Sequence, residues 1–139
     1  MRERIVMIFA ANYRRTMALV QVAQHAEDLT RAARFYTDLL GREPSATYDP
    51  PGLLFFDLDG VRLLLEQGAP SSLLYLRVDD VDAELSRLEG LGVEVTGRPH
   101  AIFRHEDDTL GPAGTEEWHA AFTDSEGNTV VLVELRPDA

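Results

Sequence analysis

The order of predicted elements repeats once along this chain, and a duplication constrains the fold more than any single motif does. The two halves are residues 17–70 and 72–136. Each half contains a strand, a helix and then three strands. Both helices begin near an aspartate, Asp28 or Asp80, and end near a glycine, Gly41 or Gly92. Aspartate caps helix N-termini and glycine favours the left-handed residue that ends a helix. The 139-residue sequence is therefore predicted to form one α+β domain of two tandem βαβββ modules.

Hydrophobic periodicity and turn residues give the boundaries within each module. In the first module we predict strands at 17–23, 45–48, 53–58 and 61–66 and a helix at 27–40. In the second module we predict strands at 73–78, 93–95, 118–123 and 129–135 and a helix at 80–91. Residues 97–117 carry few regular signals, so we predict a long loop, which is either a lid or rim of a binding site or a disordered excursion.

Residues 1–16 precede the first module and are predicted to be an extension, with Met17 as an alternative start of translation. A cleaved signal peptide is the other interpretation, because residues 5–11 are apolar and follow Arg2 and Arg4. That run is short, and the sequence after it is a poor cleavage region. No apolar run approaches the roughly 18 residues of a membrane-spanning helix, so no membrane span is expected.

The charge of the chain limits its partners. Thirteen Lys and Arg against 24 Asp and Glu give a net charge of −11. Nucleic-acid grooves and anionic membrane surfaces require clustered basic residues, so we expect neither as a partner. The same balance favours a cationic or neutral aromatic ligand. The sequence has no cysteine, which excludes thiolate chemistry and is compatible with the predicted cytoplasmic location.

Several motifs lie in a fixed order on the duplicated frame. They are Asp28-Leu29, Phe35-Tyr36 and Leu40-Gly41 on the first helix, Val78-Asp79-Asp80-Val81-Asp82 at the second, and Phe122-Thr123-Asp124-Ser125-Glu126-Gly127-Asn128 at the last hairpin. Over residues 17–136 they resemble the glyoxalase/bleomycin-resistance/dioxygenase group, the vicinal oxygen chelate superfamily. Its last hairpin usually reads Phe-x-Asp-Pro-Asp-Gly-Asn, so Ser125 and Glu126 depart from it. The resemblance implies curved mixed sheets forming a half-barrel cavity, helices outside, and a homodimer with clefts at the subunit interface.

The resemblance also implies four metal-ligand positions on the inner strand faces, two in each module. The matching residues are Gln21, Leu64 or Glu66, Leu73 and Val131. Leu73 and Val131 have no donor atom, so at most two donors remain, too few for a standard catalytic site. We therefore predict no metal cofactor. The alternative is a relocated Zn, Ni, Mn or Fe site that uses Gln21, Glu66 and His119.

Aromatic and polar side chains of the predicted strands and of the long loop are candidate ligand contacts. They are Gln21, Tyr48, Phe56, Glu66, Tyr75, Arg77, Phe103 and Trp118. Polar groups on an apolar concave sheet require a partner. That partner is a ligand, water, or, for Arg77 and Glu66, each other as a buried ion pair. Trp118 and Phe122 share a strand face, but the sequence leaves open which way that face points.

Three functions fit these observations, and no catalytic residue is assigned in any of them. The first is a metal-free, non-catalytic protein of the bleomycin-resistance type that sequesters an antibiotic or drug-like molecule. The alternative is a metal-dependent isomerase, lyase or dioxygenase of the glyoxalase type with a shifted ligand set. The third is a structural remnant that binds no ligand.

Overall fold

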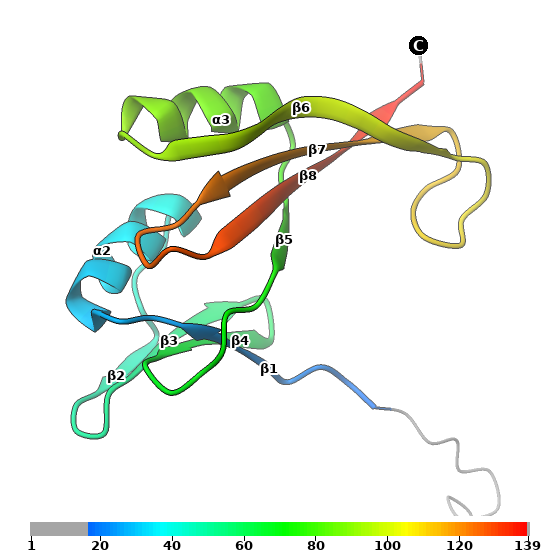
Figure 1. The fold of residues 1–139 in the computed structure, drawn as a ribbon. Coiled ribbons are helices and arrows are strands. Elements are labelled where there is room, and N and C mark those ends of the chain that lie inside the picture. Colours follow the sequence, from blue (N-terminus) through cyan, green and yellow to red (C-terminus); the bar gives the residue numbers. More distant parts are fainter. Residues whose placement is uncertain (1–16, 139) are drawn as a thin grey trace, which may run out of the picture.

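The computed structural model describes residues 17–138, so the extension or signal peptide predicted for residues 1–16 lies outside the described residues. Two modules with the same element order are present (Figure 1). The first contains β1 (Gln21–His25), α2 (Leu29–Leu40), β2 (Ala46–Tyr48), β3 (Leu53–Leu58) and β4 (Val61–Glu66). The second contains β5 (Leu74–Arg77), α3 (Val81–Gly90), β6 (Glu94–His105), β7 (Thr115–Thr123) and β8 (Thr129–Pro137). The predicted α+β fold of two βαβββ modules is confirmed.

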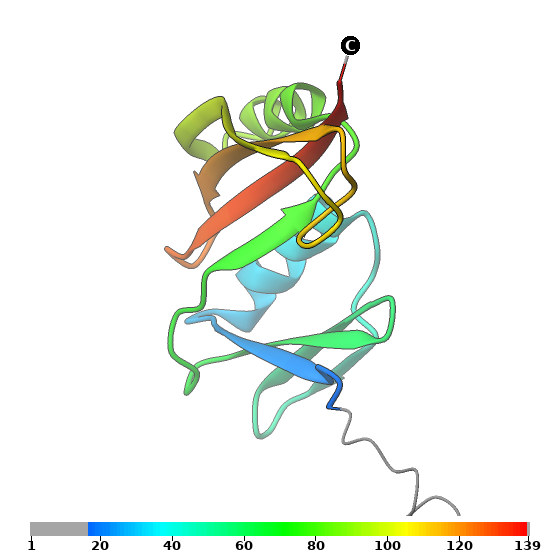
Figure 2. The ribbon, with the colours of Figure 1, turned by 90° about the vertical axis from the view of Figure 1, so that its right-hand side faces the viewer.

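Each module forms one four-stranded mixed sheet. The strand orders are β1-β4-β3-β2 and β5-β8-β7-β6. In both sheets the first strand of the module runs parallel to the last one, and the other pairs are antiparallel. Figure 1 shows α3 on the upper side of the second sheet and α2 between the levels of the two sheets. Figure 2 shows β5 as the strand of the second sheet nearest the first sheet.

The helices begin where their capping residues predict. The Asp28 carboxylate accepts a hydrogen bond from the Arg31 N–H, and Asp80 accepts one from the Ala83 N–H, both at 3.0 Å. The first helix ends at Gly41, whose φ of 67° is the left-handed conformation that glycine adopts without strain. Among the described residues, neither helix is long and apolar enough to cross a membrane.

Two apolar clusters stabilise the modules, and α2 belongs to both. Ala32 and Tyr36 of α2 are buried against the first sheet. Phe35 and Leu39 of the same helix pack against the second cluster, where the Phe35 and Phe122 ring centroids are 6.4 Å apart. Each fully buried large apolar side chain contributes roughly 1.5–3 kcal/mol. The helix therefore joins the modules through their cores.

Side-chain hydrogen bonds also join the modules. The Tyr36 hydroxyl donates to the Asp124 carboxylate at 2.6 Å. Burial and the adjacent carboxylate raise the pKa of Tyr36, so its hydroxyl stays protonated. Arg31 donates two hydrogen bonds to Glu126, at 2.7 and 3.0 Å. Because Tyr36 and Arg31 belong to α2 and the two carboxylates to the β7–β8 turn, this turn is anchored to the first module.

Two predicted boundaries are wrong. The first strand begins at Gln21 rather than at residue 17, because its pairing with β4 involves only residues 62–66 of that strand. The long loop predicted at 97–117 is mostly β6 and β7, which form a hairpin whose loop bends to the side opposite α3 (Figure 1). Three register shifts interrupt this hairpin. They break the period-two pattern by which a strand is recognised in sequence.

Candidate functional site

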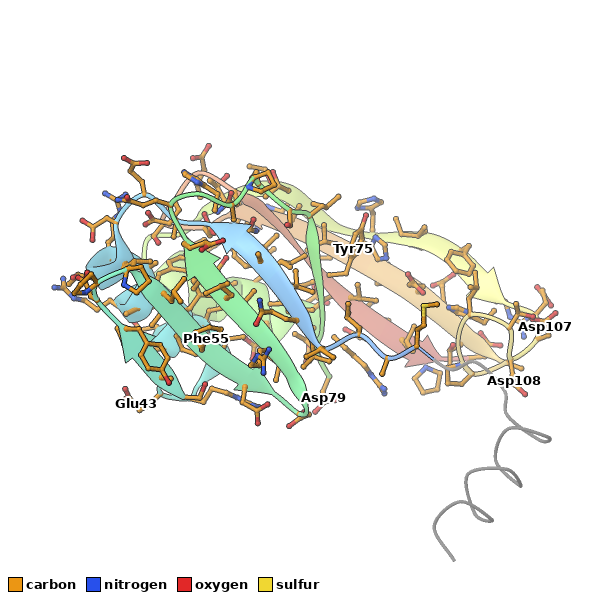
Figure 3. The ribbon with its side chains drawn as sticks, turned by 90° about the horizontal axis from the view of Figure 1, so that it is seen from below. Glu43, Phe55, Tyr75, Asp79, Asp107 and Asp108 are labelled. Carbon is orange, nitrogen blue, oxygen red and sulfur yellow. The ribbon has the colours of Figure 1, made fainter. Side chains whose placement is uncertain are left out.

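Each sheet has one face packed on helices and a second face turned away from them, which we call its open face. Side chains alternate between the two faces along each strand. Figure 3 shows both open faces from the same side, with Phe55 on the first and Tyr75 on the second. Residues 54, 56, 63 and 65 form the core of the first module, so their strand neighbours form the first open face.

The first open face holds a positive charge on β4. Arg62 lies opposite Gln21 across the parallel β1–β4 pair, and its Nε donates to the Gln21 Oε1 at 2.9 Å. The same guanidinium lies 6.0 Å from the centroid of the Phe55 ring. Tyr48 packs edge-on against Phe55, with ring centroids 6.1 Å apart. An aromatic wall and one guanidinium therefore define this face.

An acidic cleft lies where β1 and β4 end. Its volume is about 830 Å³. Its lining includes the apolar side chains of Leu29 and Leu53 and four acidic residues, Glu27, Asp28, Asp49 and Glu66. Arg31, the one basic residue of the lining among residues 17–138, is paired with Glu126. The cleft thus combines negative charge with an apolar wall, which suits a cationic ligand with an apolar body.

The second open face carries a carboxylate between two imidazoles. Glu117 contacts His105 Nε2 through Oε1 at 2.9 Å and His119 Nε2 through Oε2 at 2.6 Å. Burial acts to raise the pKa of Glu117, but hydrogen bonds from His119 and His105 outweigh it, so its pKa lies below the ordinary value. The Tyr75 ring packs edge-on against His119 at a centroid distance of 5.7 Å. This face therefore places an ionised carboxylate, two imidazoles and a phenol close together.

Two of the predicted ligand contacts do not lie where the sequence analysis placed them. Phe56 is 0% exposed and belongs to the core of the first module. Trp118 lies on the helix side of its sheet, beside the core that contains Phe122, and Arg136 stacks on its ring at 3.9 Å. Phe56 is therefore enclosed in the core, and Trp118 lies between the core and the Arg136 guanidinium. Neither side chain lies on an open face.

The other predicted contacts lie on or beside the open faces but not all together. The first face carries Gln21, Tyr48 and Glu66, and the second carries Tyr75, Arg77 and Phe103. The alternative ion pair between Arg77 and Glu66 is not formed among residues 17–138. Whether these residues contact a ligand stays a prediction.

The sequence prediction missed Phe55, Arg62, His105 and Glu117. Residues 53–56 are all apolar, so that run alone could not show which phenylalanine points to the core. Asp57 was a usable signal. A charged residue is expected on the solvent side of the strand, and Asp57 shares a face with Phe55 and not with Phe56. The Glu117-x-His119 spacing was a second usable signal, since residues i and i+2 of a strand lie on the same face.

A family model described as a glyoxalase-like domain matches residues 21–133. The chain belongs to this family. The match spans both modules of the described structure. No curated protein is similar enough to this sequence to match it.

Solved structures with the glyoxalase-like fold resemble the chain over most of its length. A lactoylglutathione lyase from Agrobacterium tumefaciens is 24% identical, with a TM-score of 0.64 over 86% of this chain and 95% of its own. An antibiotic-binding protein from a Streptomyces species is 23% identical, with a TM-score of 0.64 over 88% and 99%. A glyoxalase/bleomycin resistance/dioxygenase superfamily member from Sphaerobacter thermophilus is 21% identical, with a TM-score of 0.66 over 86% and 98%. At these identities the likeness shows the fold.

The residues at the metal positions implied for the glyoxalase-like fold do not fit a divalent ion. Gln21 already accepts a hydrogen bond from the cationic Arg62. Glu66 lies opposite His25, which is four residues along β1 from Gln21. At the usual rise of a strand, this places Glu66 about 13 Å along the sheet from Gln21. Leu73 and Val131 offer no donor. Among residues 17–138 no three His, Asp or Glu side chains are placed to hold a metal ion. Of the alternative set, Gln21 and Glu66 belong to the first sheet and His119 to the second.

Proposed function

We propose that this glyoxalase-like protein binds a cationic or neutral aromatic small molecule, of the antibiotic or drug-like kind, without transforming it. The observation that carries the proposal is the acidic cleft of about 830 Å³ beside the first open face. Apolar walls supply burial and a few charged groups fix orientation, which is the usual construction of a ligand site. The poor fit of Gln21, Leu73 and Val131 to a metal supports binding over metal-dependent chemistry. A cytoplasmic location and a role in antibiotic resistance are parts of this proposal.

A titration with two planar dyes of opposite charge tests the proposal. Ethidium, a cation, is expected to bind more tightly than fluorescein, an anion, when each is followed by fluorescence anisotropy. Glu66→Gln is expected to weaken ethidium binding about fivefold, because it removes one carboxylate from a partly solvated cleft. Glu43→Gln is the matched control, since Glu43 lies outside the cleft at an exposed position (Figure 3).

The metal-dependent alternative gives a different result in the same titration. Binding of ethidium is expected to be unchanged in EDTA. Loss of binding in EDTA, recovered with Zn²⁺ or Mn²⁺, would contradict the metal-free proposal. Tighter binding of fluorescein would contradict the proposed ligand charge.

We also propose that the functional unit is a homodimer whose subunit interface forms ligand clefts over the open faces. Large apolar side chains on or beside these faces are exposed, with Tyr48, Leu73 and Tyr75 each more than half accessible. Monomeric proteins rarely leave such surface uncovered. Sedimentation velocity at micromolar concentration is expected to show a dimer, and Leu73→Glu to shift it toward monomer. Leu110→Glu, at an exposed loop position, is the control, and a monomeric wild type would contradict the proposal.

A further inference from the structure

The hydrogen-bonding state of the two imidazoles beside Glu117 follows from the carboxylate. An ionised carboxylate only accepts hydrogen bonds, so both Nε2 atoms at 2.9 and 2.6 Å must carry the hydrogen. A neutral imidazole with its hydrogen on Nε2 has an acceptor lone pair on Nδ1. In the neutral form of each imidazole, the contact with Glu117 therefore leaves Nδ1 of His105 and His119 as the acceptor atom. A carboxylate that orients an imidazole in this way also makes it a better acceptor.

The two imidazoles differ in accessibility. The His105 side chain is 1% exposed, and the His119 side chain is 18% exposed. Gly111 packs against the His105 ring so closely that a Cβ there would lie 3.1 Å from His105 Nδ1. The β6–β7 loop thus closes the acceptor edge of His105. His119 Nδ1 has no hydrogen-bond partner among the side chains and backbone of residues 17–138.

An aromatic surface adjoins the accessible imidazole. Tyr75 lies on β5, and its ring reaches across β8 to His119 while remaining 56% exposed. The strand between them contributes Val131 and Val133, the register partners of Tyr75 and His119. A planar ring lying on this surface would stack on Tyr75 and place its edge toward His119. Figure 3 shows Tyr75 over the second sheet on the open side.

We propose that His119 is a specificity-determining contact that accepts a hydrogen bond from the hydroxyl group of a planar hydroxyaromatic ligand stacked on Tyr75. The inference rests on the proposed function, because it assumes that a small molecule binds at the open faces. It adds a chemical class, an aromatic O–H donor, and assigns Glu117 as the positioning residue. The second open face thereby selects for a hydroxyl, while the acidic cleft selects for positive charge.

A pair of probes that differ in one hydrogen-bond donor tests this inference. 2-Naphthol carries the hydroxyl, and 2-methoxynaphthalene carries a methyl ether in its place. At about pH 8, where such a phenol is un-ionised and an imidazole is ordinarily neutral, calorimetry is expected to show about tenfold tighter binding of 2-naphthol by the wild type. His119→Phe keeps the aromatic contact with Tyr75 and removes the acceptor. It is expected to reduce the ratio of the two dissociation constants to about one.

Three further variants separate recognition from structure. Glu117→Gln is expected to reduce the preference severalfold, because an amide accepts from one imidazole and donates to the other. Tyr75→Ala is expected to weaken both probes equally. His100→Phe is the matched control: His100 lies directly opposite His119, but its Nδ1 contacts the Arg98 carbonyl at 2.9 Å. It is expected to leave the preference unchanged.

The possible results distinguish this inference from the function on which it rests. Equal binding of both probes by the wild type, or a preference that survives His119→Phe, contradicts the hydroxyl recognition but leaves small-molecule binding intact. Binding of neither probe, together with no binding of ethidium, contradicts both. Binding of ethidium alone overturns only the inference. Circular dichroism of each variant shows whether a lost preference comes from a lost fold.

Discussion

Asp124→Ala is expected to lower the free energy of unfolding by about 4 kcal/mol. This buried carboxylate accepts four hydrogen bonds, from the Tyr36 hydroxyl, the Asn128 side chain and the backbone N–H groups of Glu126 and Asn128. Removing the carboxylate leaves these donors without their partner in a site that excludes water. Urea denaturation followed by circular dichroism measures the loss.

Two companion variants make this result specific. Asp79→Ala is the matched control, since Asp79 is exposed, and we expect a change within about 0.5 kcal/mol. Tyr36→Phe is expected to cost about 1–2 kcal/mol, because it removes one of the four hydrogen bonds and leaves the others. A loss below about 1 kcal/mol for Asp124→Ala would contradict a structural role for the carboxylate.

Glu126→Gln is expected to remove a pH-dependent part of the stability, worth about 2 kcal/mol near neutral pH. Burial acts to raise the pKa of Glu126, but hydrogen bonds from Arg31, the Asp28 N–H and Ser125 outweigh it and lower the pKa to about 2. Since the ordinary value is 4.5, this stability is present above pH 4.5 and is lost as the pH falls toward 2. Arg31 is half exposed, so solvent screens part of the attraction.

The comparison of wild type and Glu126→Gln at two pH values isolates this carboxylate from the other acidic groups. Their unfolding free energies are expected to differ at about pH 6 and to converge near pH 2. Glu106→Gln serves as the control, because Glu106 is an exposed loop residue that pairs with Arg104 at the end of β6. A difference between wild type and Glu126→Gln that stays constant over this range would rule out the proposed linkage.

The repeated frame could be predicted from sequence because its signals are local. Asp28 and Asp80 cap their helices through side-chain contacts within three residues, and such contacts depend little on the rest of the fold. The Asp59-Gly60 turn between β3 and β4 is equally local, with Asp59 at a positive φ of 55°. The alternation on β5 was also predicted, since Leu74 and Leu76 pack on the core while Tyr75 and Arg77 are exposed.

The candidate site was less predictable because its geometry depends on sheet register. The β6–β7 hairpin brings His105 and Glu117 together, twelve residues apart in sequence, and its register shifts hide both strands from a period-two search. The metal positions are a different case. Sequence alone showed that Leu73 and Val131 lack donors, but only the parallel β1–β4 register shows that Arg62 lies against Gln21. Long-range register of this kind is set by tertiary packing.

The division of each strand between a core face and an open face has a consequence for how such a protein diversifies. Phe56 and Leu63 belong to the first core, while their neighbours Phe55 and Arg62 lie outside it on the open face. Mutations at the open positions therefore change the chemistry offered to a ligand at small cost in folding energy. Selection for a new ligand can act on one set of alternate residues while the other set keeps the fold unchanged.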